Sequence, residues 1–539
     1  MTTSTPAPTP APAPAGAVAP LLRLAPGDTV AVAREALAAG TVVDLAAVGE
    51  AGSLTLRSEV PAGHKVALRD VAAGEPVRKY GQLIGLASEP VAAGEHVHVH
   101  NLAFTASQAG AGSAEAGRDG YAVGVDARPR LLVPPAERRT FDGFVRADGR
   151  VATRNYIGVL TSVNCSATAA RRIADTFRWP GALDQYPNVD GVVALTHGTG
   201  CGMDARGEGA QLLRRTISGY ARHPNFAALL VIGLGCEVNQ VAALTSGFDL
   251  PPEVPVVAMT IQEIGGTTLT VKAGVERVRE LLPLVDAARR VPVPASELVL
   301  GLNCGGSDAW SGVTANPALG IASDLLVAQG GTSVLAETPE VYGAEHLLTR
   351  RARDPEVAEK LLRRIRWWEE YTAAHGGSMD NNPSPGNKAG GLTTILEKSL
   401  GAVAKGGSAA LEAVYEYAEP ITAKGFAFMD TPGYDPVSVT GLVAGGANVV
   451  CFTTGRGSVF GCKPAPSIKL ATNSEVFTRM EDDMDVDCGR VLTGEQTLEE
   501  AGRELFELVL EVASGRRSKS EELGIGDEEF QPWQLGAVM

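Results

Sequence analysis

The sequence has no apolar run of about 18 residues, and it therefore predicts no transmembrane helix. No C-x-x-C pair occurs, which argues against a zinc ribbon or a thioredoxin-type redox motif. The first 20 residues contain no Lys or Arg and lack the apolar stretch of a secretory signal. We therefore expect residues 1–20 to form a disordered Ala/Pro-rich tail and the protein to be cytoplasmic.

Positive charge is also scarce. The chain carries 47 Lys and Arg against 62 Asp and Glu, a formal net charge of -15, so we expect neither a nucleic acid nor an anionic membrane as a partner. Its seven cysteines are odd in number and widely spaced, which does not predict a disulfide framework in a chain of 539 residues. Hydrophobic residues make up 45% of the sequence and charged residues 20%, as in soluble globular proteins. These features favour chemistry on a small molecule.

The hydrophobic pattern divides the chain into a β-rich part and two α/β parts. Valine-rich alternations separated by glycine turns predict a small β domain over residues 21–105. Residues 106–140 have no sustained periodicity and read as a linker. From there strands and helices alternate, which predicts mainly parallel sheets in a first α/β domain, residues 141–297, and in a second, residues 298–539, that ends in a helix.

Three of the eight histidines occur in one short segment of the β domain, with the sequence EHVHVHN. Because side chains alternate along a strand, His96, His98 and His100 are expected on one face. Such a face could contact a metal or a carboxylate, or it could simply be a solvated polar surface. His64 and Lys79 are further candidates for this region.

Four of the seven cysteines directly follow a predicted strand: Cys165, Cys201, Cys236 and Cys304. In parallel sheets, ligands bind beyond the carboxyl ends of the strands. The neighbours of these thiols include His197 and Asp308 rather than packing residues, although cysteine is also a common small buried residue. We therefore predict a site at the strand ends.

Two polar loops lie farther along the chain. Residues 301–320 join a predicted strand to a helix expected to begin at Asn316-Pro317, and their glycines allow the backbone to approach an anion closely, although a tight turn around a buried cysteine would look the same. Residues 382–391 contain two prolines and three glycines, which predicts a rigid loop without regular structure that presents Asn387 and Lys388. Arg456 follows a later strand and could bind a carboxylate. No complete dinucleotide-binding fingerprint is present.

With these motifs the sequence resembles the altronate/galactarate dehydratase family of sugar-acid dehydratases, over nearly the whole chain. The resemblance rests on six segments: Thr196-His-Gly-Thr-Gly-Cys201, Ile232-Gly-Leu-Gly-Cys-Glu237, Cys304-Gly-Gly-Ser-Asp308, Thr314-Ala-Asn-Pro317, Asn382-Pro-Ser-Pro-Gly-Asn-Lys388 and Thr454-Gly-Arg-Gly457.

The resemblance implies that the β domain is SAF-like and that the reaction removes water from a sugar acid, giving a 2-keto-3-deoxy acid. D-altronate is the first expected substrate, galactarate is the alternative, and a sulfolactate sulfo-lyase-like reaction ranks third. The resemblance also implies a divalent metal, Fe2+ first and Mn2+ second. The thiols gathered at the strand ends raise an iron–sulfur cluster as an alternative, and the incomplete fingerprint predicts no NAD.

On this chemistry we predict three groups of site residues. The metal ligands are sought among His197, Cys165, Cys201, Cys236 and Cys304, since imidazole and thiolate suit Fe2+ better than Mg2+. The proposed catalytic residues are Lys388, Asp308, His98 and His64, and the proposed substrate-binding residues are Ser307, Asn387, Arg456 and Lys79. The expected small-molecule partner is the sugar acid. A second copy of the chain, in a homo-oligomer, is the other partner that we consider.

Overall fold

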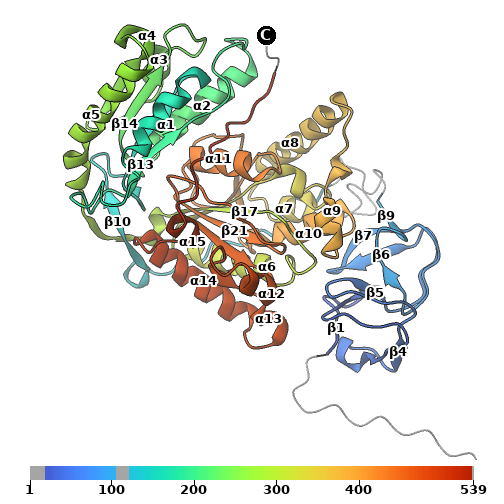
Figure 1. Ribbon diagram of the computed structural model, residues 1–539. Helices are drawn as coiled ribbons and strands as arrows, with labels where there is room; N and C mark the ends of the chain where they lie inside the picture. Colours follow the sequence, from blue (N-terminus) through green and yellow to red (C-terminus); the bar gives the residue numbers. More distant parts are fainter. Residues whose placement is uncertain (1–18, 105–120, 537–539) are drawn as a thin grey trace, which may run out of the picture.

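The computed structural model of the chain describes residues 19–104 and 121–536, so most of the predicted tail and part of the predicted linker lie outside it. Figure 1 shows a β domain and a smaller α/β domain on opposite sides of a central, larger α/β domain. The predicted fold class, a β-rich N-terminal domain followed by two α/β domains with mainly parallel sheets, is confirmed. The exact domain limits given above stay a prediction.

The β domain contains three small antiparallel sheets with strand orders β1-β2-β5-β8, β3-β4 and β6-β7-β9. Its strands are short because glycine turns interrupt the chain every few residues, as the sequence predicts. They are β1 (Leu21–Leu22), β2 (Val30–Ala33), β3 (Val42–Asp44), β4 (Ser53–Thr55), β5 (Lys65–Ala67), β6 (Pro76–Lys79), β7 (Gln82–Ala87), β8 (His96–Val97) and β9 (Leu102–Ala103).

The smaller α/β domain is built on a four-stranded parallel sheet of order β13-β12-β14-β15. Its strands are β12 (Tyr156–Thr161), β13 (Gly191–Leu195), β14 (Phe226–Gly233) and β15 (Val256–Thr260), and its helices are α1 (Ala167–Asp175), α2 (Glu208–Arg222), α3 (Val241–Ser246), α4 (Ile261–Ile264) and α5 (Thr267–Asp286). A separate antiparallel sheet joins β11 (Val151–Ala152), β10 (Thr140–Val145) and β16 (Arg290–Pro294).

Alternation along β12 places apolar side chains on both faces of this sheet. Ile157 and Val159 pack against α1 and α5, whereas Tyr156 and Leu160 face the core that contains α2. That second core also includes Val439 from the central domain. The sheet is therefore buried on both faces, as expected for parallel strands, and one face joins the two α/β domains.

The central domain is built on a seven-stranded parallel sheet of order β19-β20-β18-β17-β21-β22-β23. Its strands are β17 (Val299–Cys304), β18 (Thr332–Leu335), β19 (Leu411–Tyr415), β20 (Gly425–Met429), β21 (Val449–Thr454), β22 (Ser467–Ala471) and β23 (Val486–Asp487). The helices are α6 (Ala315–Ala328), α7 (Glu345–Thr349), α8 (Pro355–Ala374), α9 (Pro385–Ala389), α10 (Ile395–Val403), α11 (Asp435–Gly445), α12 (Ser474–Arg479), α13 (Arg490–Thr493), α14 (Leu498–Ala513) and α15 (Lys519–Glu522).

The β domain shares a hydrophobic core with the central domain. Buried residues of β6 and β7, such as Val77 and Ile84, belong to the same cluster as Leu300 of β17 and Leu505 of α14. The side chain of Thr394 donates a hydrogen bond to the Ile84 carbonyl oxygen, at 2.5 Å. The β domain is thus docked on the central domain by a continuous apolar contact.

The start of α6 differs from the sequence-based prediction. The helix begins at Ala315, after Thr314, so the expected start at Asn316-Pro317 is wrong and Asn316 does not cap the helix. The Asn316 side chain is buried, donates to the Gly401 carbonyl oxygen and accepts a hydrogen bond from Thr453. A tertiary role therefore replaces the capping role.

The segment of residues 382–391 also differs, because it contains the short helix α9 where no regular structure was expected. Ser384 and Asn387 form a reciprocal capping box, and Pro385 occupies the first helical turn. Proline at this position loses no helical hydrogen bond, so the two prolines do not exclude a helix here.

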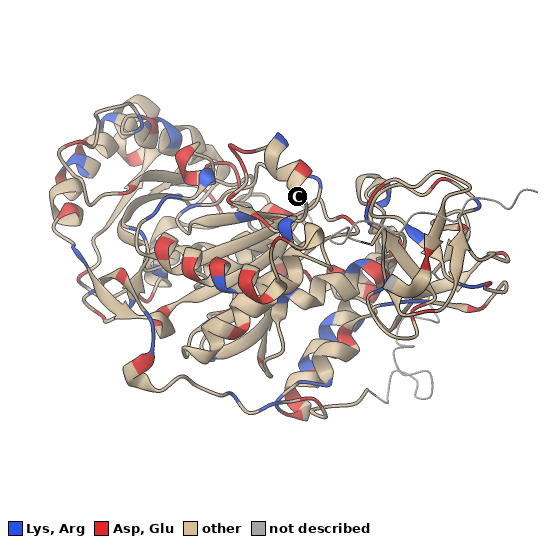
Figure 2. Ribbon diagram, turned by 90° about the horizontal axis from the view of Figure 1, so that it is seen from below, with Lys and Arg blue, Asp and Glu red and all other residues tan. Residues whose placement is uncertain are grey.

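Charged residues of both signs are interspersed along the outer helices, as Figure 2 shows. Within the described part of the chain, no helix combines the length and apolar character needed to cross a membrane.

Candidate functional site

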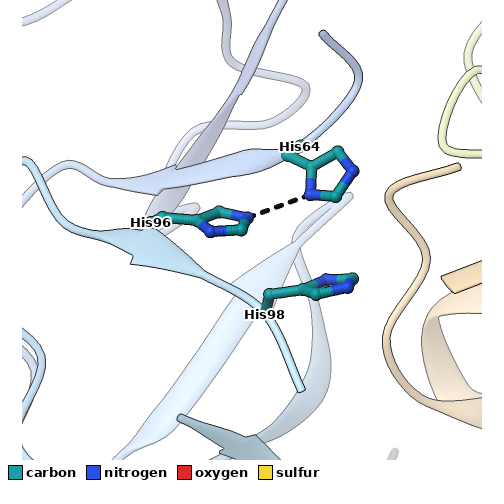
Figure 3. Close-up of side chains that lie close together, drawn as sticks. All are labelled: His64, His96 and His98. Atoms are coloured by element: carbon teal, nitrogen blue, oxygen red, sulfur yellow. Dashed lines mark hydrogen bonds between the residues drawn. The ribbon is translucent and has the colours of Figure 1, made fainter. Parts of the chain in front are cut away.

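Three histidines of the β domain form a compact cluster, which we call the histidine cluster: His64, His96 and His98. Their ring centroids lie 4.8 to 5.4 Å apart, and the His100 ring lies 5.4 Å from that of His96. Figure 3 shows the three rings of the cluster pointing towards the same side. The predicted gathering of these imidazoles is confirmed, although β8 itself covers only His96 and Val97.

The histidine cluster has the properties of a cation site. Burial lowers the pKa of His64, and it lowers the pKa of His96 to about 4 and that of His98 to about 3, so the imidazoles are neutral at pH 7. His64 Nδ1 and His96 Nε2 lie 2.9 Å apart, and His98 Nδ1 is buried without a hydrogen-bond partner. Two nitrogen ligands about 2.1 Å from one ion and at right angles to each other are about 3 Å apart. The ligand atoms therefore fit a divalent metal.

The cluster faces the central domain. His64 Nε2 lies 3.4 Å from the Ala389 carbonyl oxygen at the end of α9. The preceding residue, Gly63, has a positive φ of 79° and sits so close to Trp310 and Gly390 that a β-carbon there would contact both. The histidine cluster thus lies beside both polar loops that the sequence singles out.

A buried ion triad, formed by Lys65, Lys79 and Glu397, holds this arrangement. The two Nζ atoms lie 2.9 and 2.8 Å from the Glu397 carboxylate, and all three side chains are at most 1% exposed. Lys65 also donates to the Gly391 carbonyl oxygen at 2.7 Å. Burial lowers the pKa of Lys65 to about 8, whereas for Glu397 the effect of burial is outweighed by the two ammonium groups, which lower the pKa of the carboxyl. The triad joins β5 and β6 to α10.

A second cluster lies at the carboxyl ends of β17 and β18, and we call it the Cys304 cluster: Cys304, Glu337, Glu340, Lys398 and Lys405. Lys405 Nζ lies 2.6 Å from Cys304 Sγ and 3.2 Å from Glu337. The thiol donates to Glu340 at 3.1 Å, and Lys398 Nζ lies 2.6 Å from the same carboxylate. Glu337 Oε1 is buried without a hydrogen-bond partner.

Burial dominates the electrostatics of the Cys304 cluster. It raises the pKa of the Cys304 thiol, with Glu337 adding to the effect, so the thiol stays protonated. It also raises the pKa of Glu337, and it raises the pKa of nearby Asp435 to about 7. For Glu340 burial acts in the same direction, but Lys398 outweighs it and lowers the pKa. The carboxyl groups therefore differ in their readiness to release a proton.

The segment of residues 382–391 connects the two clusters. At its start, Asn382 donates to Glu340 at 3.2 Å and accepts from Lys398 at 2.8 Å. At its end, the Ala389 carbonyl oxygen meets His64. Lys388 is half-buried between these ends and next to Ala389. Among the predicted catalytic residues outside the histidine cluster, Lys388 directly precedes the residue whose carbonyl oxygen meets His64.

The other residues predicted in the two loops have mainly structural contacts. Asp308 is buried and accepts hydrogen bonds from Ser311, Thr472 and Asn473. Asn387 donates to the Ser307 carbonyl oxygen at 2.7 Å, which ties the two loops together. These contacts occupy the Asp308 carboxylate and the Asn387 amide, so their predicted roles towards substrate stay predictions.

Arg456 and Lys79, both predicted to bind substrate, are placed differently. Arg456 is exposed beside the glycine-rich loop, where its amide donates to the Gly306 carbonyl oxygen. The ammonium group of Lys79 is enclosed by the ion triad, so this geometry gives no support to a contact with substrate.

The predicted metal shell is divided between domains. His197 is buried, its Nε2 donates to the Thr161 carbonyl oxygen at 3.0 Å, and its Nδ1 faces Thr199, so both ring nitrogens are already used. Cys304 belongs to the central domain and contacts Lys405 and two carboxyl groups. Cys165, Cys201 and Cys236 are exposed in the smaller α/β domain. One ion bound by members of all these groups finds no support in the geometry.

The sequence-based site omits the charged partners of Cys304. Glu337 lies two residues after the end of β18, so the rule applied to the cysteines at strand ends would have selected it. Lys398 in α10 and Lys405 just after that helix carried no such signal, because lysines in a helical segment ordinarily face solvent.

Comparison with known proteins covers most of the chain. Three family models match in succession: the altronate/galactarate dehydratase SAF domain over residues 19–105, the second domain of D-galactarate dehydratase/altronate hydrolase over residues 143–286, and the C-terminal domain of D-galactarate/altronate dehydratase over residues 295–538.

Three relatives are similar along most of their length. The chain is 38% identical to altronate dehydratase of Escherichia coli (strain K12), over 92% of this chain and 95% of the relative. It is 36% identical to altronate dehydratase of Bacillus subtilis (strain 168), over 86% and 90% of the two chains. It is also 38% identical to galactarate dehydratase (L-threo-forming) of Escherichia coli (strain K12), over 86% and 88%.

Proposed function

The chain belongs to the D-galactarate/altronate dehydratase family, and on this premise we propose that it is a hydro-lyase that removes water from a sugar acid to give a 2-keto-3-deoxy acid. D-altronate is the first candidate substrate, because two of the relatives described above are altronate dehydratases. Galactarate is the alternative, supported by the third relative. A cytoplasmic location and a homo-oligomeric state stay predictions.

One observation supports the position of the active site: the neutral histidine cluster faces the segment that carries Lys388. We place the family's divalent metal on His64, His96 and His98, with Fe2+ as the first candidate and Mn2+ as the second, since imidazole suits both. When bound, such an ion neutralises negative charge that develops on a carboxylate as its α-proton leaves.

The Cys304 cluster is the second group able to hold a cation, but it is the weaker candidate. Two ammonium groups, those of Lys398 and Lys405, already lie within 3.2 Å of its carboxylates. They would repel a divalent ion, whereas the ammonium group of Lys65, which acts on the histidine cluster, is paired with the Glu397 carboxylate. The raised pKa of Glu337 fits a role in holding protons instead.

The protein's own side chains would handle the proton and the substrate carboxylate. Lys388 would accept the α-proton and pass it to the hydroxyl on the next carbon, so that this hydroxyl departs as water. The exposed Arg456 guanidinium can bind the carboxylate through two parallel hydrogen bonds. The enol formed in this way then tautomerises to the keto acid.

Turnover of defined substrates tests the reaction. Protein purified anaerobically and loaded with Fe2+ should convert D-altronate, or else galactarate, to a keto-deoxy acid without added NAD. If substrate is consumed only when NAD is present, the dehydratase proposal is refuted.

A matched pair of histidine variants tests the metal site. In protein that has not been reconstituted with sulfide, His96→Asn should lower bound Mn2+ at least tenfold and abolish turnover, because it removes one of three ligands. His375→Asn should leave both unchanged, since His375 is exposed on the end of α8. The test is to measure the metal content of both variants. Equal metal binding by the two would contradict the assignment of the metal to the histidine cluster.

A further inference from the structure

Three thiols outside the proposed active site gather at one edge of the smaller α/β domain. Cys165 follows β12, Cys201 lies in the loop after β13, and Cys236 follows β14. These strands are neighbours in a parallel sheet of order β13-β12-β14, so their carboxyl ends meet at the same edge. All three cysteines are exposed, whereas the other four cysteines are buried.

Hydrogen bonds fasten the three loops to one another. Asn164, next to Cys165, donates its amide to the Thr199 carbonyl oxygen at 2.9 Å. Asn239 donates its amide to the Gly200 carbonyl oxygen at 3.1 Å, and its side chain donates to the Ser162 carbonyl oxygen at 3.1 Å. The three loops that carry the thiols are therefore held together by hydrogen bonds.

A buried carboxylate and two glycines also fix the conformation of these loops. Ser162 donates its hydroxyl to Glu237 at 2.6 Å, one residue from Cys236. Gly200 and Gly235, each directly before a thiol, have φ angles of 98° and 126°. Only glycine adopts such angles readily, and a β-carbon would clash with the Ser162 carbonyl oxygen at Gly200 and with Gln262 at Gly235, so glycine is needed for the close packing of these loops.

The spacing of the thiols excludes a single ion held by all three. Around one zinc ion with Zn–S distances of about 2.3 Å, tetrahedral thiolates lie about 3.8 Å apart. Among the described residues, the sets of three ligand atoms that lie within 4.8 Å of one another do not include these sulfur atoms. A polynuclear cluster bonds each thiolate to a different iron, so its ligands are farther apart.

We propose that Cys165, Cys201 and Cys236 ligate an iron–sulfur cluster of the [4Fe–4S] type, whose fourth iron has no cysteine ligand. The site is separate from the histidine cluster, which belongs to the β domain. Because the three thiols are exposed, the iron without a protein thiolate is open to solvent or to a small oxygen ligand.

Sulfide analysis of the full-length chain tests this site independently of activity. After anaerobic reconstitution with Fe2+ and sulfide, the parent protein should retain about four acid-labile sulfides per chain. Each of Cys165→Ser, Cys201→Ser and Cys236→Ser should retain less than about a quarter of that amount. Cys462→Ser is the control and should retain all of it, because its buried thiol bonds within the central domain.

Protection from alkylation provides a measurement on the parent protein alone. Iodoacetamide should modify the three exposed cysteines before reconstitution and leave them unmodified afterwards. The proposal is overturned if the parent retains no sulfide, or retains it equally in all three variants, or binds one metal atom at these thiols without sulfide. The histidine variant His96→Asn should keep its sulfide, so this result is distinguishable from failure of the proposed active site.

Discussion

The buried ion triad offers a sharp test of how the β domain is held. Glu397 accepts hydrogen bonds from Lys65, Lys79 and Thr393, and its carboxylate is fully buried. In Glu397→Gln the shape of the side chain is kept, but two ammonium groups lose their counter-charge inside the protein. We expect a strong loss of stability at the contact between the β domain and the central domain.

The magnitude follows from the cost of an unpaired buried charge. Removing one partner of a buried ion pair costs about 3–5 kcal/mol, whereas breaking an exposed pair costs at most about 1 kcal/mol. Glu507 provides the matched control, because its carboxylate pairs with Arg139 while both side chains are nearly half exposed. Glu397→Gln should therefore destabilise the protein several times more than Glu507→Gln.

Urea unfolding followed by circular dichroism measures the difference. A third variant, in which Lys65, Lys79 and Glu397 are all replaced by Met, should recover much of the loss because no charge remains buried. If Glu397→Gln unfolds at the same urea concentration as Glu507→Gln, the triad does not hold the domains together and the reasoning is refuted.

Two further predictions concern buried titratable groups. Lys405→Met should destabilise the protein by about 1–3 kcal/mol, since Cys304 and Glu337 would lose a buried hydrogen-bond donor. The exposed Lys424→Met should cost less than about 1 kcal/mol, and equal unfolding midpoints would contradict this. Burial lowers the pKa of His223 to about 4, so the folded state favours the neutral imidazole. The contribution of this imidazole to the free energy of unfolding is therefore complete above about pH 6.5 and is lost as the pH falls towards 4. His223→Gln should flatten this part of the pH dependence measured by urea unfolding, and an unchanged slope would refute the assignment.

Much of the fold could be predicted because local signals agree with the tertiary structure. The predicted alternation of strands and helices in the second α/β domain is found in its parallel sheet, and the helix predicted at its end corresponds to α14. In α14 the boundary is fixed locally by a capping box between Thr497 and Glu500. The order of the strands in each sheet could not be predicted, since it depends on packing between segments far apart in the chain.

The candidate site could be predicted only where residue type and position gave the same signal. His96 and His98 share a strand-like pattern, and imidazole is a common ligand, so the β domain was implicated from sequence. Lys65, by contrast, occurs in a pattern typical of an exposed strand end, and only the tertiary structure shows that Glu397 neutralises it. Buried charges of this kind are paired over long sequence distances, which no local pattern records.

The triad also determines where the histidine cluster stands relative to Lys388. Lys65 is adjacent to His64 and bonds both to Glu397 and to Gly391, three residues after Lys388. A loosened triad should therefore displace the metal ligands from the base while leaving the ligands themselves, all within the β domain, close to one another. We expect Glu397→Gln to retain most of its bound iron but to lose at least tenfold in turnover, measured at a temperature where circular dichroism shows it folded. Loss of iron in proportion to turnover would mean that the triad supports the metal site directly, and undiminished turnover would mean that docking does not position Lys388.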